Sequence, residues 1–151
     1  MTTIVLAKGE GGRLEAPGVG WIKQEKWTSY DFIGSAEGVG DLVFKRNWTG
    51  RKHTIEDSQG RVRGEHEREG WTGSSGPLMW DDVHYEFAVH SGWKGSFVLR
   101  RNNEDLATFT LKNFWRDVEV EVLDNAHVPA ALMLFGAWMT ILRQRDSAAS
   151  G

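Results

Sequence analysis

The chain has 151 residues and a formal net charge of −3, which fits a single domain with a sizeable core. Because it contains no cysteine, disulfides, thiolate nucleophiles and cysteine-based metal sites are excluded. The small negative charge provides no overall basic field, so nucleic acid is not an expected partner.

The N-terminal stretch has only a short apolar run, Ile4 to Ala7, and no basic leader, so we expect no secretory signal and a cytoplasmic location. Eighteen glycines and eight tryptophans favour many short strands joined by turns. Glycine clusters divide the chain at short intervals, and none of them separates two domains. We therefore expect one domain over residues 1–146 and a flexible tail over 147–151.

The first predicted hairpin joins KHTIED (52–57) to RVRGEHERE (61–69) through the turn SQG. Its strands are polar, which favours an exposed hairpin. His53 and His66 belong to these strands, and His127 precedes the C-terminal apolar run. Their spacing suggests no site, so we interpret each as structural or exposed.

The segment DVHYEFAV (82–89) alternates between apolar and polar side chains, which is typical of a half-buried strand. His84, Glu86 and His90 share its polar face and are acceptable zinc or iron ligands. However, six residues of strand would separate the two histidines by roughly 20 Å. We therefore predict solvent-facing side chains and no metal.

A second hairpin is predicted from SFVLRR (96–101) and TFTLK (108–112) around the turn NNED, and VEVEV (118–122) is another half-buried strand. Residues 51–71 and 95–115 overlay without a gap, with strand, turn, strand and terminal tryptophan in register. This match predicts a repeated structural unit, with a third partial copy that ends at Trp48. We interpret Trp48, Trp71 and Trp115 as core side chains in preference to membrane anchors.

The segment 128–142 contains no charged residue and predicts a helix over about 128–143. Asp124 or Asn125 can cap its start, and Arg143 and Arg145 complement its C-terminal end. As a helix it spans roughly 22 Å, which is short of the roughly 30 Å of a bilayer core.

Large apolar side chains surround this predicted helix on every side, which is typical of a helix buried on every side. The core side chains expected on it are Leu132, Leu134, Phe135, Trp138, Met139, Ile141 and Leu142. The rest of the chain offers some ten or more short strands. We therefore predict a mainly β fold, a closed antiparallel β-barrel around a buried hydrophobic C-terminal α-helix.

The hairpins HTIEDSQGRVRGEHEREGW (53–71) and FVLRRNNEDLATFTLKNFW (97–115), followed by the helix 128–142, resemble the Tubby C-terminal-like superfamily, which includes LURP-one-related and phospholipid-scramblase-like proteins. The resemblance implies a barrel of about twelve strands threaded by the helix. Members are similar to membrane-surface phosphoinositide binders or to proteins proposed to act on phospholipids. The chain has no recognisable counterparts of the basic lipid-binding residues, so none is carried over.

Three pairs of basic residues suggest a rim that binds anionic headgroups or a protein partner, together with Trp48, Trp71 or Trp93. The pairs are Lys45–Arg46, Arg51–Lys52 and Arg100–Arg101. The competing interpretation is a set of solvated strand ends interleaved with Glu65, Glu67 and Glu69.

The function expected from these features is a non-enzymatic binding or scaffold module without cofactor or metal, associated peripherally with the membrane when it binds lipid. GSSG (73–76) lacks the spacing of a nucleophile elbow, and Glu119 and Glu121 lie on a regular polar strand face. Two alternatives stay open. One is a barrel that holds a small ligand or an undetected hydrolytic site, and the other is a tail-anchored membrane protein.

Overall fold

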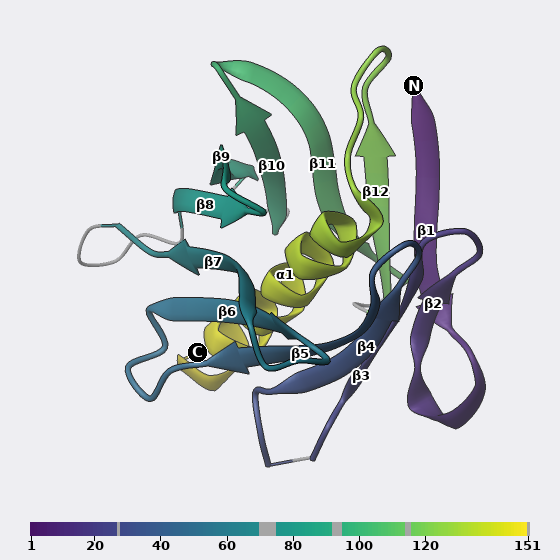
Figure 1. The fold of residues 1–151 in the computed structure, drawn as a ribbon, viewed down its shortest axis with the longest axis vertical. Coiled ribbons are helices and arrows are strands. Elements are labelled where there is room, and N and C mark those ends of the chain that lie inside the picture. Colours follow the sequence, from purple (N-terminus) through teal and green to yellow (C-terminus); the bar gives the residue numbers. More distant parts are fainter. Residues whose placement is uncertain (27, 70–74, 92–94, 114–115, 151) are drawn as a thin grey trace.

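The computed structural model describes residues 1–26, 28–69, 75–91, 95–113 and 116–150. For residue 91 and residues 147–150 it describes the main chain alone. It is a closed barrel of twelve antiparallel strands around one helix, which confirms the predicted architecture (Figure 1). The strands are β1 (Thr2–Lys8), β2 (Leu14–Ala16), β3 (Gly20–Gln24), β4 (Phe32–Ala36), β5 (Gly40–Arg46), β6 (Lys52–Asp57), β7 (Val62–Glu67), β8 (Gly76–Trp80), β9 (Val83–Ser91), β10 (Ser96–Arg101), β11 (Glu104–Lys112) and β12 (Asp117–Val122); a short 3-10 turn spans Glu10–Gly12 and the helix α1 spans Ala130–Ser150.

Every strand pairs with its neighbour in sequence, and β1 closes the barrel against β12, with Ile4 opposite Val120. Closure leaves no unpaired sheet edge. Because strand direction alternates, the connections fall at two ends of the barrel. We call the end where α1 begins the entry end and the end where α1 leaves the exit end. At the entry end the amino group of Met1 contacts the carboxylate of Asp124.

Two hairpins at the entry end turn through paired residues in the left-handed region. The φ angles are 48° and 65° at Asp81 and Asp82, and 55° and 66° at Asn102 and Asn103. A two-residue type I′ hairpin needs positive φ at both central positions, and Asn and Asp tolerate it better than most residues. The predicted turn at NNED is therefore confirmed, with its last two residues already in β11.

The inside of the barrel follows the predicted alternation of apolar and polar positions. In β12 the inward residues are buried, whereas Glu119 and Glu121 lie on the other face. Phe97 of β10 is opposite Phe109 of β11, and its ring stacks on Phe87 at 4.6 Å between centroids. The barrel core includes Leu6, Ile22, Phe44, Ile55, Phe87, Phe97, Phe109, Val118 and Val120.

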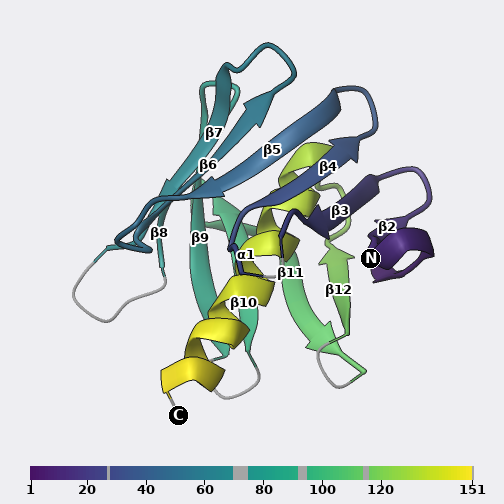
Figure 2. The same cartoon turned by 90° about the horizontal axis from the view of Figure 1, so that it is seen from below.

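The helix α1 fills the interior of the barrel and extends past the strands at the exit end (Figure 2). Burial is confirmed for Leu132, Leu134, Phe135, Trp138, Met139 and Leu142, whereas Ile141 is only partly buried. Gly136 lies so close to the ring of Phe109 that an added Cβ would be 2.5 Å from it.

The helix is longer than the sequence predicts. It begins at Ala130 and continues through Ser150, so it includes most of the predicted tail 147–151. Ala148 and Ala149 are strong helix formers, and no glycine or proline lies between residues 137 and 150. No helix within the described ranges has the length and apolarity needed to span a membrane.

The polar hairpin β6–β7 is part of the barrel wall, so its predicted exposure is wrong. His53, Ile55 and His66 are 5%, 0% and 2% exposed, because every second residue faces the core.

The predicted match between residues 51–71 and 95–115 also holds for an irregularity in the strand pairing. The strand register shifts between Ile55 and Glu56 in one hairpin and between Leu99 and Arg100 in the other, which are equivalent positions.

Of the three tryptophans that the repeat places in the core, the structure describes only Trp48. Trp48 is 96% exposed in the β5–β6 turn, so its assignment to the core is wrong. Trp48 is the second of the five residues between β5 and β6, and its side chain faces solvent. Trp71, Trp93 and Trp115 lie outside the described residues.

Candidate functional site

The structure divides the predicted basic rim between the two ends of the barrel. Lys45 and Arg46 end β5 and Lys52 begins β6, so these residues and Arg51 lie at the exit end. The pair Arg100–Arg101 ends β10, which runs in the opposite direction to β5, and therefore lies at the entry end. The competing interpretation, strand ends paired with glutamates, applies in part, since Lys52 Nζ is 3.7 Å from Glu65 Oε2.

In the entry-end pair, the positive charge of Arg100 is matched by neighbouring carboxylates. Arg100 Nε donates to Asp105 Oδ1 at 2.7 Å, and its Nη1 is 3.6 Å from Glu86 Oε1 on the adjacent strand. The Arg101 guanidinium lies 5.9 Å from the centre of the Tyr85 ring. His84 and His90 are exposed on β9, which confirms their predicted solvent-facing positions.

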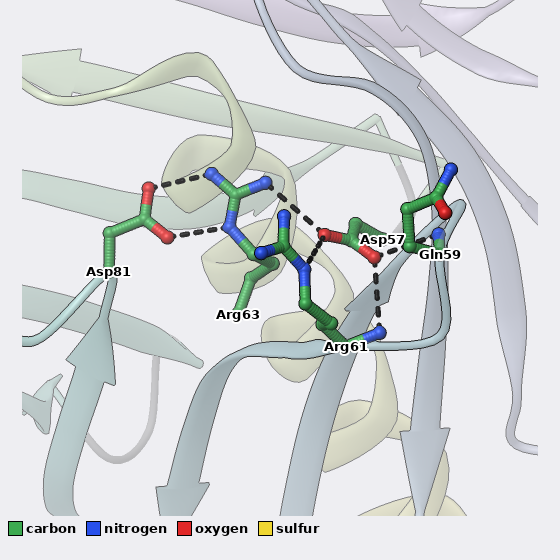
Figure 3. Close-up of polar contacts among 5 residues, drawn as sticks. All are labelled: Asp57, Gln59, Arg61, Arg63 and Asp81. Atoms are coloured by element: carbon green, nitrogen blue, oxygen red, sulfur yellow. Dashed lines mark hydrogen bonds and ion pairs between the residues drawn. The ribbon is translucent and has the colours of Figure 1, made fainter.

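Further entry-end charges form a clamp between two turns (Figure 3). Asp57 accepts backbone N–H bonds from Gln59 and Arg61 at 2.9 and 3.1 Å. Arg63 binds both carboxylate oxygens of Asp81 at 2.6 and 2.8 Å, and its Nη1 is 3.6 Å from Asp57 Oδ2. The clamp therefore ties the β6–β7 turn to the β8–β9 turn.

The clamp also fixes the ionisation of its acids. Burial acts to raise the pKa of Asp57, but the hydrogen bonds from Arg61 and Gln59 outweigh it and the pKa is lowered. The hydrogen bond from Arg63 lowers the pKa of Asp81. Both carboxylates stay charged near neutral pH, so this end offers matched pairs of opposite charge.

The exit end brings together five arginines that are distant in sequence: Arg46, Arg51, Arg68, Arg143 and Arg145. Asp146 is shared by two of them, at 3.0 Å from Arg46 Nη1 and 4.0 Å from Arg68 Nη1. Burial lowers the pKa of Arg68, and the positive charges of Arg46, Arg51 and Arg143 lower it further, against the effect of Asp146. Positive charge is therefore concentrated here.

The β5–β6 turn holds Trp48 at the edge of this cluster. The side chain of Asn47 accepts the backbone N–H groups of Arg51 and Lys52, both at 3.1 Å. Gly50 has a φ of 75°, and its carbonyl accepts a bond from Arg68 Nη1 at 3.2 Å. The turn is thus closed by its own hydrogen bonds and presents the indole outward.

A second aromatic side chain lies at the same end. Tyr30 is 43% exposed, and the Arg46 guanidinium lies 4.3 Å from the centre of its ring. The carbonyl of Tyr30 accepts a bond from Trp138 Nε1 at 3.0 Å. The buried helix therefore positions the β3–β4 connection beside the arginine cluster.

Inside the wall at this end, His53 and His66 form a buried cross-strand pair with ring centroids 6.0 Å apart. Burial is the main cause that lowers the pKa of His53 to about 3, and the His66 imidazole and the Arg46 and Arg68 guanidiniums add to it. Burial lowers the pKa of His66 to about 4. Both rings are therefore neutral near pH 7.

Sequence reasoning missed this pair because it assigned the whole hairpin to the surface. The spacing His53–Ile55–Asp57 was the available signal, since it places the histidine on the same strand face as an apolar residue. Among the described residues, no group of three or more His, Asp or Glu side chains is placed to hold a metal ion. Arg68, Arg143 and Arg145 were also absent from the predicted rim.

Comparison with models of known protein families, with curated proteins and with solved structures found no match to this chain. The observed barrel of twelve strands with a central helix agrees with the architecture that the Tubby-like resemblance implies. Membership of that superfamily stays a prediction, carried by the two hairpins and the helix.

Proposed function

We propose that the protein is a non-enzymatic binding module that attaches to anionic phospholipid surfaces through the exit end of its barrel. The observation that carries this proposal is Trp48, an almost fully exposed indole held outward by a closed turn beside Arg46, Arg51 and Lys52. Covering this exposed indole with a partner surface would be favourable, and the cations beside it would add to the attraction of an anionic one.

An indole and neighbouring cations suit the interface of a bilayer. Tryptophan and tyrosine prefer the headgroup level, where one part of the ring is apolar and another is wet. Each lysine or arginine near an anionic surface contributes about 1 kcal/mol of attraction. Trp48 and Tyr30 supply the aromatic part of this surface, and the arginine cluster supplies the charge.

The filled interior supports binding at the outside over chemistry in a lumen. Trp138 and Phe135 of α1 are fully buried, and the Trp138 ring packs against Phe135 and against Phe44 of the wall. A barrel packed in this way presents its functional groups at its ends and outer face.

Flotation with vesicles tests the proposal. We expect the full chain to float with vesicles of phosphatidylserine and phosphatidylcholine and to stay behind with phosphatidylcholine alone. Trp48→Ala should reduce flotation strongly. The matched control is Val62→Ala, which removes an exposed apolar side chain at the entry end and should float like wild type. Equal flotation of both variants, or none by wild type, would contradict the proposal.

A further inference from the structure

A cleft beside α1 at the exit end has the features of a site for one small amphiphilic anion. It lies where β1, β2, β3 and β4 approach the helix, and its volume is about 390 Å³. Small-ligand sites typically have volumes of about 300–1,000 Å³. Strand β2 has only three residues, so the wall is short beside the last turns of the helix.

The floor of the cleft is apolar. It is formed by Leu14, Ile22, Phe32 and Ile141, which come from β2, β3, β4 and α1. Ile22 and Phe32 are 0% and 3% exposed and lie under the surface of the floor, whereas Leu14 and Ile141 are partly buried and offer the apolar surface that a ligand can reach. Ile141 is thus a large apolar side chain of α1 that the barrel wall leaves partly open, and the opening is this cleft.

The walls of the cleft are cationic. Lys8, Lys23, Arg116 and Arg145 line it, and none of its described lining residues is a carboxylate. Within the described part of the chain, none of these four side chains has an acidic partner within 4.0 Å. At the entry end, by contrast, Arg63 and Arg100 bind aspartates at 2.6 and 2.7 Å.

Arg145 is the most informative of the four. Its guanidinium lies 5.4 Å from the centre of the Phe32 ring, and its Nη2 donates to the neutral amide oxygen of Gln24 at 3.1 Å. Burial lowers the pKa of this guanidinium, so it is incompletely hydrated as well as unmatched in charge. A carboxylate can replace the amide oxygen and accept two parallel N–H bonds, which are stronger than one bond to a neutral acceptor.

We propose that this cleft binds a single-chain alkyl carboxylate, a fatty acid, with its chain on the floor formed by Leu14, Ile22, Phe32 and Ile141 and its carboxylate on Arg145. Lys8, Lys23 and Arg116 surround the headgroup with additional positive charge. Arg145 belongs to both the arginine cluster and this cleft, but Trp48 and the other four arginines of the cluster do not line the cleft, so the proposal does not rest on membrane attachment.

Calorimetric titration of the full chain with decanoate, below the concentration at which it forms micelles, tests the chemistry of the ligand. Acetate supplies the carboxylate without the chain, and decanol supplies the chain without the charge. We expect decanoate to bind at least about tenfold more tightly than either probe, because each lacks one of the two interactions. An affinity no higher than that of decanol, or of acetate, overturns the proposal.

Variants place the binding in the cleft. Arg145→Gln should weaken decanoate binding by at least about tenfold, the effect of losing a charged hydrogen-bond partner. Arg101→Gln removes a cation at the entry end and should leave the affinity unchanged, and Trp48→Ala should also leave it unchanged. Equal affinities of wild type and Arg145→Gln, or equal losses in Arg145→Gln and Arg101→Gln, overturn the proposal.

If Arg145→Gln unfolds, the exposed substitutions Lys23→Gln and Arg116→Gln take its place, and their decanoate affinities are compared with those of wild type and Arg101→Gln.

Methyl NMR of the wild-type chain locates the bound decanoate without any change in stability. Decanoate should shift the methyl signals of Ile22 and Ile141 and leave that of Ile55 on β6 in place. Shifts spread equally over all three residues contradict a site in the cleft.

Discussion

The two ends of the barrel differ in how many acids accompany their arginines. At the entry end, Arg63 and Arg100 each bind an aspartate at less than 3 Å, and the hydrogen bond from Arg63 lowers the pKa of Asp81. At the exit end, Lys45 and Lys52 lie 3.0 and 3.7 Å from glutamates on neighbouring strands, but Arg46 and Arg68 share one acid, Asp146. The entry end therefore has the character of a structural clamp, whereas the exit end presents cations beside exposed aromatic rings.

Strand direction is the cause of this difference. A basic pair at the end of one strand and a basic pair at the end of another share a rim only if the two strands run in the same direction. Lys45–Arg46 and Arg100–Arg101 end strands that run in opposite directions, so similar sequence motifs have different surroundings. The predictions below separate the two ends, from the largest expected effect to the smallest.

The largest effect is expected from Trp138→Ala, which removes the side chain that links the core to the exit end. Its ring contacts Phe32, Phe44 and His53, and its Nε1 donates to Tyr30. Truncating a buried tryptophan costs about 3–5 kcal/mol of the free energy of unfolding. Urea unfolding measures it, and a loss below about 1 kcal/mol would show that the ring is not packed as described.

On acidification, we expect the free energy of unfolding to fall first because of the exit-end histidines and only at lower pH because of the entry-end aspartates. The pKa values of His53 and His66 are lowered to about 3 and about 4 in the folded chain, whereas unfolded histidine titrates near 6.5. Below that value the unfolded chain binds more protons, so stability falls as the pH falls. Each histidine should cost about 2 kcal/mol between about pH 7 and about pH 5.

The entry-end acids act in a lower pH range. Because the pKa values of Asp57 and Asp81 are lowered by folding, their stabilisation is present above the ordinary pKa of aspartate and is lost only as the pH falls below it. Urea unfolding of wild type and His66→Phe from neutral to mildly acidic pH separates the two contributions. An unchanged pH dependence in the variant would exclude the histidine as its source.

A smaller effect is expected from Gly136→Ala in the middle of α1, midway between the ends. On an open helix this substitution stabilises by about 1 kcal/mol. Here the new methyl group would meet the Phe109 ring at 2.5 Å, so we expect a net loss of about 1–2 kcal/mol. A stabilised variant in urea unfolding would mean that α1 does not lie against β11.

Much of the fold can be predicted from local patterns, because alternation and an all-round apolar helix have few structural solutions. The contents of the exit end cannot, since they depend on pairing over long distances. His53 meets His66 only through strand register, and Arg46 meets Asp146 across a separation of 100 residues. Whether Arg100 lies at the entry end or the exit end depends on the direction of every intervening strand, including the short β8.

Trp48 illustrates the same limit for a single residue. The repeat of strand, turn and tryptophan predicts an equivalent position for each tryptophan, but it does not say whether the turn points the ring inward. That depends on hydrogen bonds within the turn, such as those accepted by Asn47. Trp138, by contrast, is placed by a run of apolar neighbours and is buried as predicted.

The most direct test of the central claim is a pair of charge reversals, Lys52→Glu at the exit end and Arg101→Glu at the entry end. They change the net charge equally. Urea unfolding checks that both variants stay folded, since Lys52→Glu also removes the contact with Glu65. The measurement is the affinity for phosphatidylserine-containing vesicles at low and high salt. We expect Lys52→Glu to weaken binding by about tenfold and to reduce its salt dependence, whereas Arg101→Glu binds like wild type. Equal weakening by the two variants would contradict an exit end that binds the membrane.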